Sequence, residues 1–176
     1  MASDGDRDIE IATWVGGATE TDREGLASAL DAELRALVSR TVLFHQAVAD
    51  RLRMSVLDLS CLGALVRRGA MSAGELAGEN GVTTGAITGV VDRLEAGGYV
   101  RRAKDPLDRR RVVVTLLPQA EDRIGPLFEG LTRSLGRLCE KYGEDELRTV
   151  VEFLRAAAPV TREETLRLRA AGRTGA

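Results

Sequence analysis

The sequence of 176 residues is poor in the residue types that catalysis and metal binding most often use: it has one histidine, two cysteines and 3% aromatic residues. No Ser-His-Asp or Cys-His arrangement is visible, and no Gly-rich phosphate loop follows a strand pattern. Cys61 and Cys139 form neither a disulfide framework nor a spacing of metal ligands. We therefore expect no enzymatic activity, no metal and no cofactor.

Long apolar runs are also missing. No run of about 18 apolar residues is present, and the first ten residues, MASDGDRDIE, are acidic and polar. The sequence thus predicts no membrane span, no secretion signal and a cytoplasmic location. Because aromatics are few, the core must be built from Leu, Val and Ala, which favours a mainly helical fold.

Charge is present in quantity but is unevenly distributed along a chain whose formal net charge is −2. The first 32 residues hold eight acids and two arginines, whereas residues 101–111 hold six basic and two acidic residues. The chain therefore has a charge dipole, and its basic segment is the candidate contact for a polyanion.

Residues 55–117 carry the pattern of a winged helix-turn-helix. Each of three short helices is expected to have a polar cap before it and a glycine after it. The predicted caps and stops are Ser55 and Gly69, Ser72 and Gly81, and Thr83 and Gly97. The segment YVRRAKDPLDRRRVVVTLL then predicts a β-hairpin, with turn residues at 105–108 and the basic cluster on its loop.

Long amphipathic helices are expected on both sides of this unit. Residues 21–53 predict one helix with Thr21 and Glu24 as its capping box, and residues 119–170 predict helices interrupted at Gly143 and Pro159. Their apolar stripes are wider than one small winged helix can cover, so we expect a homodimer through 21–53 and 119–170. Residues 1–20 should form a partly ordered arm, and residues 171–176 a disordered tail.

The segment AGELAGENGVTTGAITGVVDRLEAGGYVRRAKDPLDRRRVVVTLLPQA resembles the helix-turn-helix and wing of the MarR (multiple antibiotic resistance regulator) family of bacterial transcription factors. The steps VDRLEAGGYVRR and DPLDRRR…VTL are its specific parts, and the resemblance covers roughly residues 25–157. It implies a dimeric, sequence-specific DNA-binding regulator, more often a repressor, on a pseudo-palindromic operator. Where relatives commonly have Leu-Thr-Pro-Glu-Gly, this chain has Leu116-Leu117-Pro118-Gln119-Ala120, which should affect the start of the next helix.

The resemblance also implies which residues contact DNA. The start of the recognition helix, at residues 83–88, would enter the major groove. Arg110 would enter the minor groove, and Asp108 would hold its loop. Neighbouring arginines would lie near phosphates. The full candidate set is Ser72, Thr83, Thr84, Gly85, Thr88, Arg93, Arg101, Arg102, Asp108, Arg109, Arg110 and Arg111.

Members of this family are often switched by a small aromatic or phenolic ligand bound between the dimer helices and the winged domain. The candidate lining here is Trp14, Phe44, His45, Arg53 and Asp58. Some urate-responsive relatives carry a tryptophan on an added N-terminal helix, which is the reason for including Trp14. Phe44 and His45 are equally compatible with the core, and Arg53 with a solvated helix end.

Two alternatives stay open. Cys61 or Cys139 could make the protein a thiol-based redox regulator of the same fold, although neither thiol has an obvious reason to ionise easily. The winged helix could instead bind a protein, with Arg109–Arg111 pairing with an acidic partner and no DNA target. Binding to duplex DNA separates the last alternative from a regulator.

Overall fold

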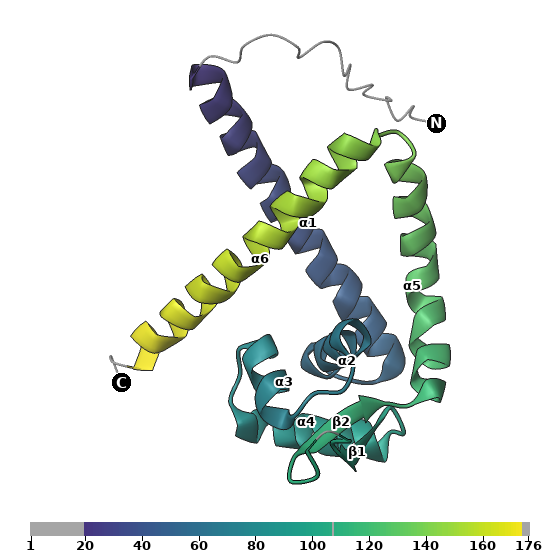
Figure 1. Ribbon diagram of the computed structural model, residues 1–176. Helices are drawn as coiled ribbons and strands as arrows, with labels where there is room; N and C mark the ends of the chain where they lie inside the picture. Colours follow the sequence, from purple (N-terminus) through teal and green to yellow (C-terminus); the bar gives the residue numbers. More distant parts are fainter. Residues whose placement is uncertain (1–19, 107, 174–176) are drawn as a thin grey trace. The chain divides into compact units, whose positions relative to one another are not determined.

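The computed structural model describes residues 20–106 and 108–173 (Figure 1). Their elements follow in the order α1 (Glu20–Leu52), α2 (Val56–Arg68), α3 (Ala73–Asn80), α4 (Thr84–Ala96), β1 (Val100–Lys104), β2 (Val112–Leu116), α5 (Pro118–Cys139) and α6 (Glu144–Arg173). The fold is mainly helical with one two-stranded sheet, as predicted. The chain divides into two units, Met1–Phe44 and His45–Ala176.

The second unit holds the hydrophobic core, which α2, α3, α4 and the hairpin build together (Figure 1). Each helix contributes apolar residues three or four positions apart, so that one face is buried and the other stays in water. The largest fully buried side chains are Leu62, Leu76, Ile87, Val90, Val91, Val100 and Cys61. Burial therefore fixes which side of α4 remains available for contact.

Local capping sets the ends of the short helices as predicted. Capping boxes are present at Ser55–Asp58 and at Ser72–Glu75, where each side chain satisfies a backbone amide of the other residue. Thr83 accepts a hydrogen bond from the amide of Ala86 at 3.3 Å and starts α4. Gly81 ends α3 in the left-handed conformation (φ 61°), which glycine adopts at little steric cost. These residues make the turn between α3 and α4 short.

The wing consists of β1, β2 and the loop between them (residues 100–116). The strands are antiparallel, and their register runs from Val100 opposite Leu116 to Lys104 opposite Val112. On its other side β2 pairs with Met71 through two backbone hydrogen bonds of 3.1 and 2.7 Å between Met71 and Val114. The wing is thus joined to the chain just before α3 as well as to α4.

The structure corrects the predicted ends of the long helices. The first helix already includes Glu20 and Thr21, so Thr21 does not cap it, and residues 1–19 lie outside the described residues. α6 continues through Pro159 to Arg173, where the sequence predicted a break and then a tail from residue 171. Proline removes one helical hydrogen bond and costs about 3 kcal/mol. The helix formers on both sides of Pro159 outweigh this local cost.

The long helices keep many apolar side chains exposed, in contrast to the core. On α1 and on α5 and α6, the exposed ones include Leu26, Leu30, Leu37, Val38, Val42, Leu43, Leu131, Leu135, Leu138, Val150, Val151, Phe153, Leu154, Val160, Leu166 and Leu168. Within the described ranges no helix combines the length and the hydropathy needed to cross a bilayer.

Candidate nucleic-acid interface

The exposed face of α4 begins with small polar residues. The apolar side of this helix is buried, and Thr84, Gly85 and Thr88 lie on its exposed side near the N-terminus. The hydroxyl of Thr88 donates to the carbonyl of Thr84 at 3.0 Å, and that of Thr83 caps the helix. Small side chains let another molecule approach the free amides of a helix start, which favour an anion. α4 therefore has the geometry of a recognition helix.

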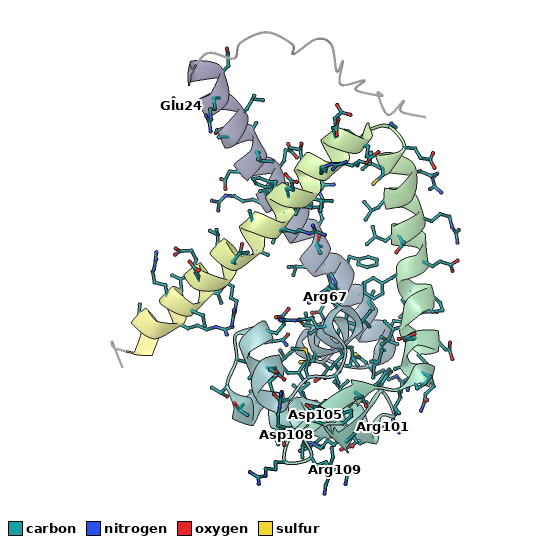
Figure 2. The ribbon with its side chains drawn as sticks, in the orientation of Figure 1. Glu24, Arg67, Arg101, Asp105, Asp108 and Arg109 are labelled. Carbon is teal, nitrogen blue, oxygen red and sulfur yellow. The ribbon has the colours of Figure 1, made fainter. Side chains whose placement is uncertain are left out.

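The wing presents several of its cations to solvent. Figure 2 shows Asp108 and Arg109 at the loop of the hairpin and Arg101 on its strand, whereas Arg67 lies on α2. In the part of the chain that the structure describes, no ion pair joins Arg101, Arg109 or Arg110 to an acid. Asp108 accepts a hydrogen bond from the amide of Arg110 at 3.0 Å, within the loop of the wing.

Two other arginines of the candidate set have acidic partners on the helix-turn-helix. Arg102 binds Asp92 at 2.6 Å and Glu95 at 2.5 Å, both on α4. Arg111 binds Glu75 at 2.8 Å, near the start of α3, and lies 3.8 Å from Asp105. The sequence placed Arg102 and Arg111 near phosphates, but the structure shows their guanidinium groups already paired within the chain.

Arg93 is also paired, with a carboxylate that the sequence assigned to the ligand site. Its guanidinium donates to both oxygens of Asp58, at 2.6 and 3.4 Å, and Asp58 accepts the amide of Ser55 at 3.0 Å. Burial alone raises the pKa of the Asp58 carboxyl, but the bonds from Arg93 and Ser55 outweigh burial and hold that pKa below its ordinary value. Asp58 is only 3% exposed, and its bond to Arg93 joins α2 to α4.

The other ligand candidates are Trp14, Phe44, His45 and Arg53. Trp14 lies outside the described residues, and Phe44 and His45 are half-buried. The ring of His45 lies 5.8 Å from that of Phe128, centroid to centroid. Arg53 is exposed in the turn after α1, with a positive φ of 55° that is unusual for a residue other than glycine.

Sequence reasoning missed Glu75, Asp92 and Glu95 as partners of the wing, and it missed Arg123. Arg123 of α5 donates to the carbonyl of Gly97 at 2.9 Å and lies 3.9 Å from the ring centroid of Tyr99. No sequence motif pairs these residues, since only the fold brings them together. The one weak hint was the acidic pair at the end of α4, shortly before the basic segment.

The two thiols differ in environment. Cys61 is fully buried on α2, and burial raises its pKa to about 11, so almost none of it is thiolate at neutral pH. Cys139 is exposed at the end of α5. The geometry around Cys61 therefore gives no support to a redox switch at that residue.

Comparison with known proteins agrees with this geometry. Residues 54–111, which include α2, α3, α4 and β1, match the MarR family. The chain is 43% identical over 152 residues to the HTH-type transcriptional regulator YcgE of Bacillus subtilis, covering 86% of this chain and 99% of the relative. It is 29% identical over 84 residues to the HTH-type transcriptional repressor YetL of the same organism, covering 48% and 50%.

Solved structures share the fold. One of them is NadR in complex with 4-hydroxyphenylacetate, which is 20% identical, has a TM-score of 0.57 and covers 83% of this chain and 96% of its own. At that identity the similarity shows the fold alone. The close relationship to YcgE, the family match over the helix-turn-helix, and the shared fold together assign the chain: it belongs to the MarR family of winged-helix, DNA-binding transcription regulators.

Proposed function

We propose that the protein is a homodimeric repressor that binds a pseudo-palindromic operator and is released by a small aromatic or phenolic ligand. A two-fold symmetric dimer presents two recognition helices, so the operator should contain two half-sites about one helical turn apart. Binding to the chromosome also requires the cytoplasmic location that the sequence predicts.

The observation that carries the proposed dimer is the exposed apolar surface of the long helices. Leu131, Leu135 and Leu138 on α5 are 40%, 49% and 47% exposed, and α6 repeats the pattern with Val150, Leu154 and others. Apolar stripes of this extent are typical of an interface and not of a monomer's surface. A second copy of the chain has matching stripes, which supports pairing through 21–53 and 119–170.

The proposed reading of DNA divides the contacts by type. Thr83, Thr84, Gly85 and Thr88 lie where the recognition helix would meet base edges in the major groove. Arg110, whose loop is held by Asp108, would enter the minor groove. Arg101 and Arg109 would bind phosphates and position the protein without reading sequence.

The names of relatives support repression and the binding of a phenolic ligand. YetL is a repressor, and NadR was solved with 4-hydroxyphenylacetate. For this chain the candidate lining is Trp14, Phe44, His45 and Arg53. The fifth candidate is Asp58, which is buried and whose carboxylate accepts hydrogen bonds from Ser55 and Arg93.

Selection from pooled random duplexes at about 150 mM salt tests the proposal, with Arg110→Ala and, as a control, Arg133→Ala. Arg133 is an exposed arginine on α5 that pairs with Glu129 at 2.8 Å. The wild type and Arg133→Ala should enrich a palindrome, and Arg110→Ala should lose or relax it. With six to ten phosphate contacts per dimer, affinity should fall by about 10³ to 10⁵ between 50 and 200 mM salt.

Failure to enrich any duplex across a range of salt concentrations would contradict DNA reading and favour a protein-binding winged helix. Sedimentation as a monomer at micromolar concentration would contradict the dimer alone.

A further inference from the structure

The basic residues of the wing fall into two structural classes. Arg101, Arg109 and Arg110 are exposed and form no ion pair with any acid in residues 20–106 and 108–173. Arg102 and Arg111 have carboxylate partners on two different helices. Sequence cannot separate the classes, because members of both stand side by side: Arg101 next to Arg102, and Arg110 next to Arg111.

Arg102 connects β1 to the C-terminal half of α4. Its two terminal nitrogens bind different acids, Asp92 at 2.6 Å and Glu95 at 2.5 Å. Glu95 also accepts the backbone amide of Arg102 at 2.9 Å, so the strand is held by its main chain and its side chain together. The Arg102 side chain is 34% exposed, less than that of any other arginine whose ion pairs the structure describes. This arrangement fixes the root of the wing on the recognition helix.

Arg111 connects the other end of the wing loop to α3. One oxygen of Glu75 accepts the Arg111 guanidinium at 2.8 Å and both the amide and the hydroxyl of Ser72 at 2.7 Å. The backbone of Arg111 closes the loop as well, accepting from the Asp105 amide at 3.0 Å and donating to the Asp108 carbonyl at 2.9 Å. These bonds to Ser72 and Arg111 lower the pKa of Glu75 to about 2, so it stays ionised at any working pH.

We propose that Arg102 and Arg111 are wing tethers: through Asp92 and Glu95 on α4, and Glu75 on α3, they set the position of the wing relative to the helix-turn-helix. Asp92, Glu95 and Glu75 are then positioning residues for DNA binding, although each is negatively charged. The outward cations Arg101, Arg109 and Arg110 make the contacts to DNA. This inference rests on the proposed DNA reading.

Replacing the acids by neutral residues tests the proposal, because loss of charge and loss of wing position should change the affinity for DNA in opposite directions. Losing a negative charge beside DNA should by itself tighten binding, because the net repulsion of phosphates falls. If the acids position the wing, Glu75→Gln and Asp92→Asn/Glu95→Gln should instead weaken binding to the selected operator, by about threefold to tenfold. Glutamine keeps the capping-box geometry at position 75, so the helix start is preserved.

Glu79→Gln is the matched control. Glu79 lies one turn after Glu75 on α3 and pairs with Arg67 and Arg68 of α2 at 3.5 and 2.6 Å, not with the wing. Like Glu75→Gln, the Glu79→Gln substitution removes one negative charge from α3, so it should leave the affinity for DNA unchanged or raise it. Equal or tighter binding by Glu75→Gln and by the double variant would overturn the proposal.

The dependence of affinity on salt separates tethers from phosphate contacts. Arg101→Gln and Arg109→Gln should each lower the slope of log affinity against log salt by about one per protomer. Arg102→Gln and Arg111→Gln should weaken binding while leaving the slope unchanged. A fall in slope with Arg102→Gln and Arg111→Gln equal to that of Arg101→Gln would make these residues phosphate ligands and overturn the proposal.

A measurement without DNA keeps this inference distinct from the proposed function. Hydrogen exchange of the wing amides should be faster in Glu75→Gln and in the double variant than in the wild type, and unchanged in Glu79→Gln. If no duplex binds the wild type, the proposed function fails, and hydrogen exchange alone tests whether Arg102 and Arg111 are tethers. The tether proposal would be overturned if the wing amides of both acid variants exchanged as slowly as those of the wild type.

Discussion

Apolar residues are buried in the segment from α2 to β2, but many of them are exposed on the long helices. Leu62 on α2 is 1% exposed, whereas Leu43 on α1 is 70% exposed and Leu168 on α6 is 74% exposed. The first region completes its core within one chain, with capped helices and a hairpin that closes over them. The second has apolar stripes that nothing covers among the described residues. Stability of the first region should therefore be intramolecular, and that of the second should depend on protein concentration.

The largest expected effect lies in the core. Leu76→Ala removes a fully buried side chain of α3 and should lower the free energy of unfolding by about 2–5 kcal/mol, since a cavity replaces its contacts. Leu43→Ala, at an exposed position, should cost less than about 0.5 kcal/mol at concentrations where the chain is monomeric. Urea denaturation of both variants measures this. Similar losses in the two would erase the contrast between the regions.

The next effect concerns association. Leu135→Gln with Leu154→Gln places polar groups on the apolar stripes of α5 and α6 and should weaken self-association by about tenfold or more. Arg133→Gln, on α5, is the control and should leave the association constant unchanged. Sedimentation equilibrium over a concentration series reports the constant. Unaltered association of the double variant would mean that these stripes are not the interface.

Ion pairs should follow the same division. The pKa of Asp58 is depressed in the folded state, so its stabilisation is fully present above its ordinary value of about 4 and is lost as pH falls through the lower folded value. Asp58→Asn should therefore be less stable than the wild type by about 1–3 kcal/mol at pH 7, with the difference shrinking toward pH 3.

Asp31→Asn is the control for that pH series. Asp31 pairs with Arg35 at 2.8 Å on α1, where the two side chains are 61% and 78% exposed, so its replacement should have no measurable effect on stability. A difference between Asp58→Asn and wild type that stayed constant from pH 7 to pH 3 would show that the charge of Asp58 is not what stabilises the core.

The smallest effect lies where the two regions join. α5 begins after Leu117, which makes no side-chain cap. Leu117→Thr should be more stable than Leu117→Val, a variant of nearly the same shape, by about 1 kcal/mol, because only threonine can accept an amide of the first turn. Thermal denaturation of the pair isolates the cap. Equal melting temperatures would show that the helix start needs no cap.

Much of the winged unit could be predicted because its determinants are local. These determinants act within a few residues along the chain. They are a serine or threonine three positions before a free amide, a glycine after the last apolar residue, and a turn between alternating strands. The structure accordingly confirms the caps Ser55 and Ser72 and the stop at Gly81. It also places the predicted cap Thr83 before the recognition helix.

Local sequence patterns gave the wrong helix end where a long helix could tolerate an unfavourable residue. Pro159 was predicted to end a helix, but one missing hydrogen bond is a small fraction of the 30-residue α6. Burial of strand residues also depends on more than the local pattern, since Val113 and Val114, neighbours on β2, are both buried. Alternation predicts which residues share a face, not whether both faces are covered.

By itself the sequence determined the order of the elements, the helix caps, the basic wing and the resemblance to a family, all of which depend on spacing along the chain. Only the tertiary structure decided which charges are used internally. Asp58 and Arg93 are 35 residues apart, and Glu75 and Arg111 are 36 apart, yet each pair is joined by a hydrogen bond. Composition does not distinguish one arginine from another. Packing places carboxylates beside Arg93, Arg102 and Arg111, whereas no carboxylate of the described residues forms an ion pair with Arg109 or Arg110. Electrostatic attraction falls with distance in space, and distance in space is set by the fold.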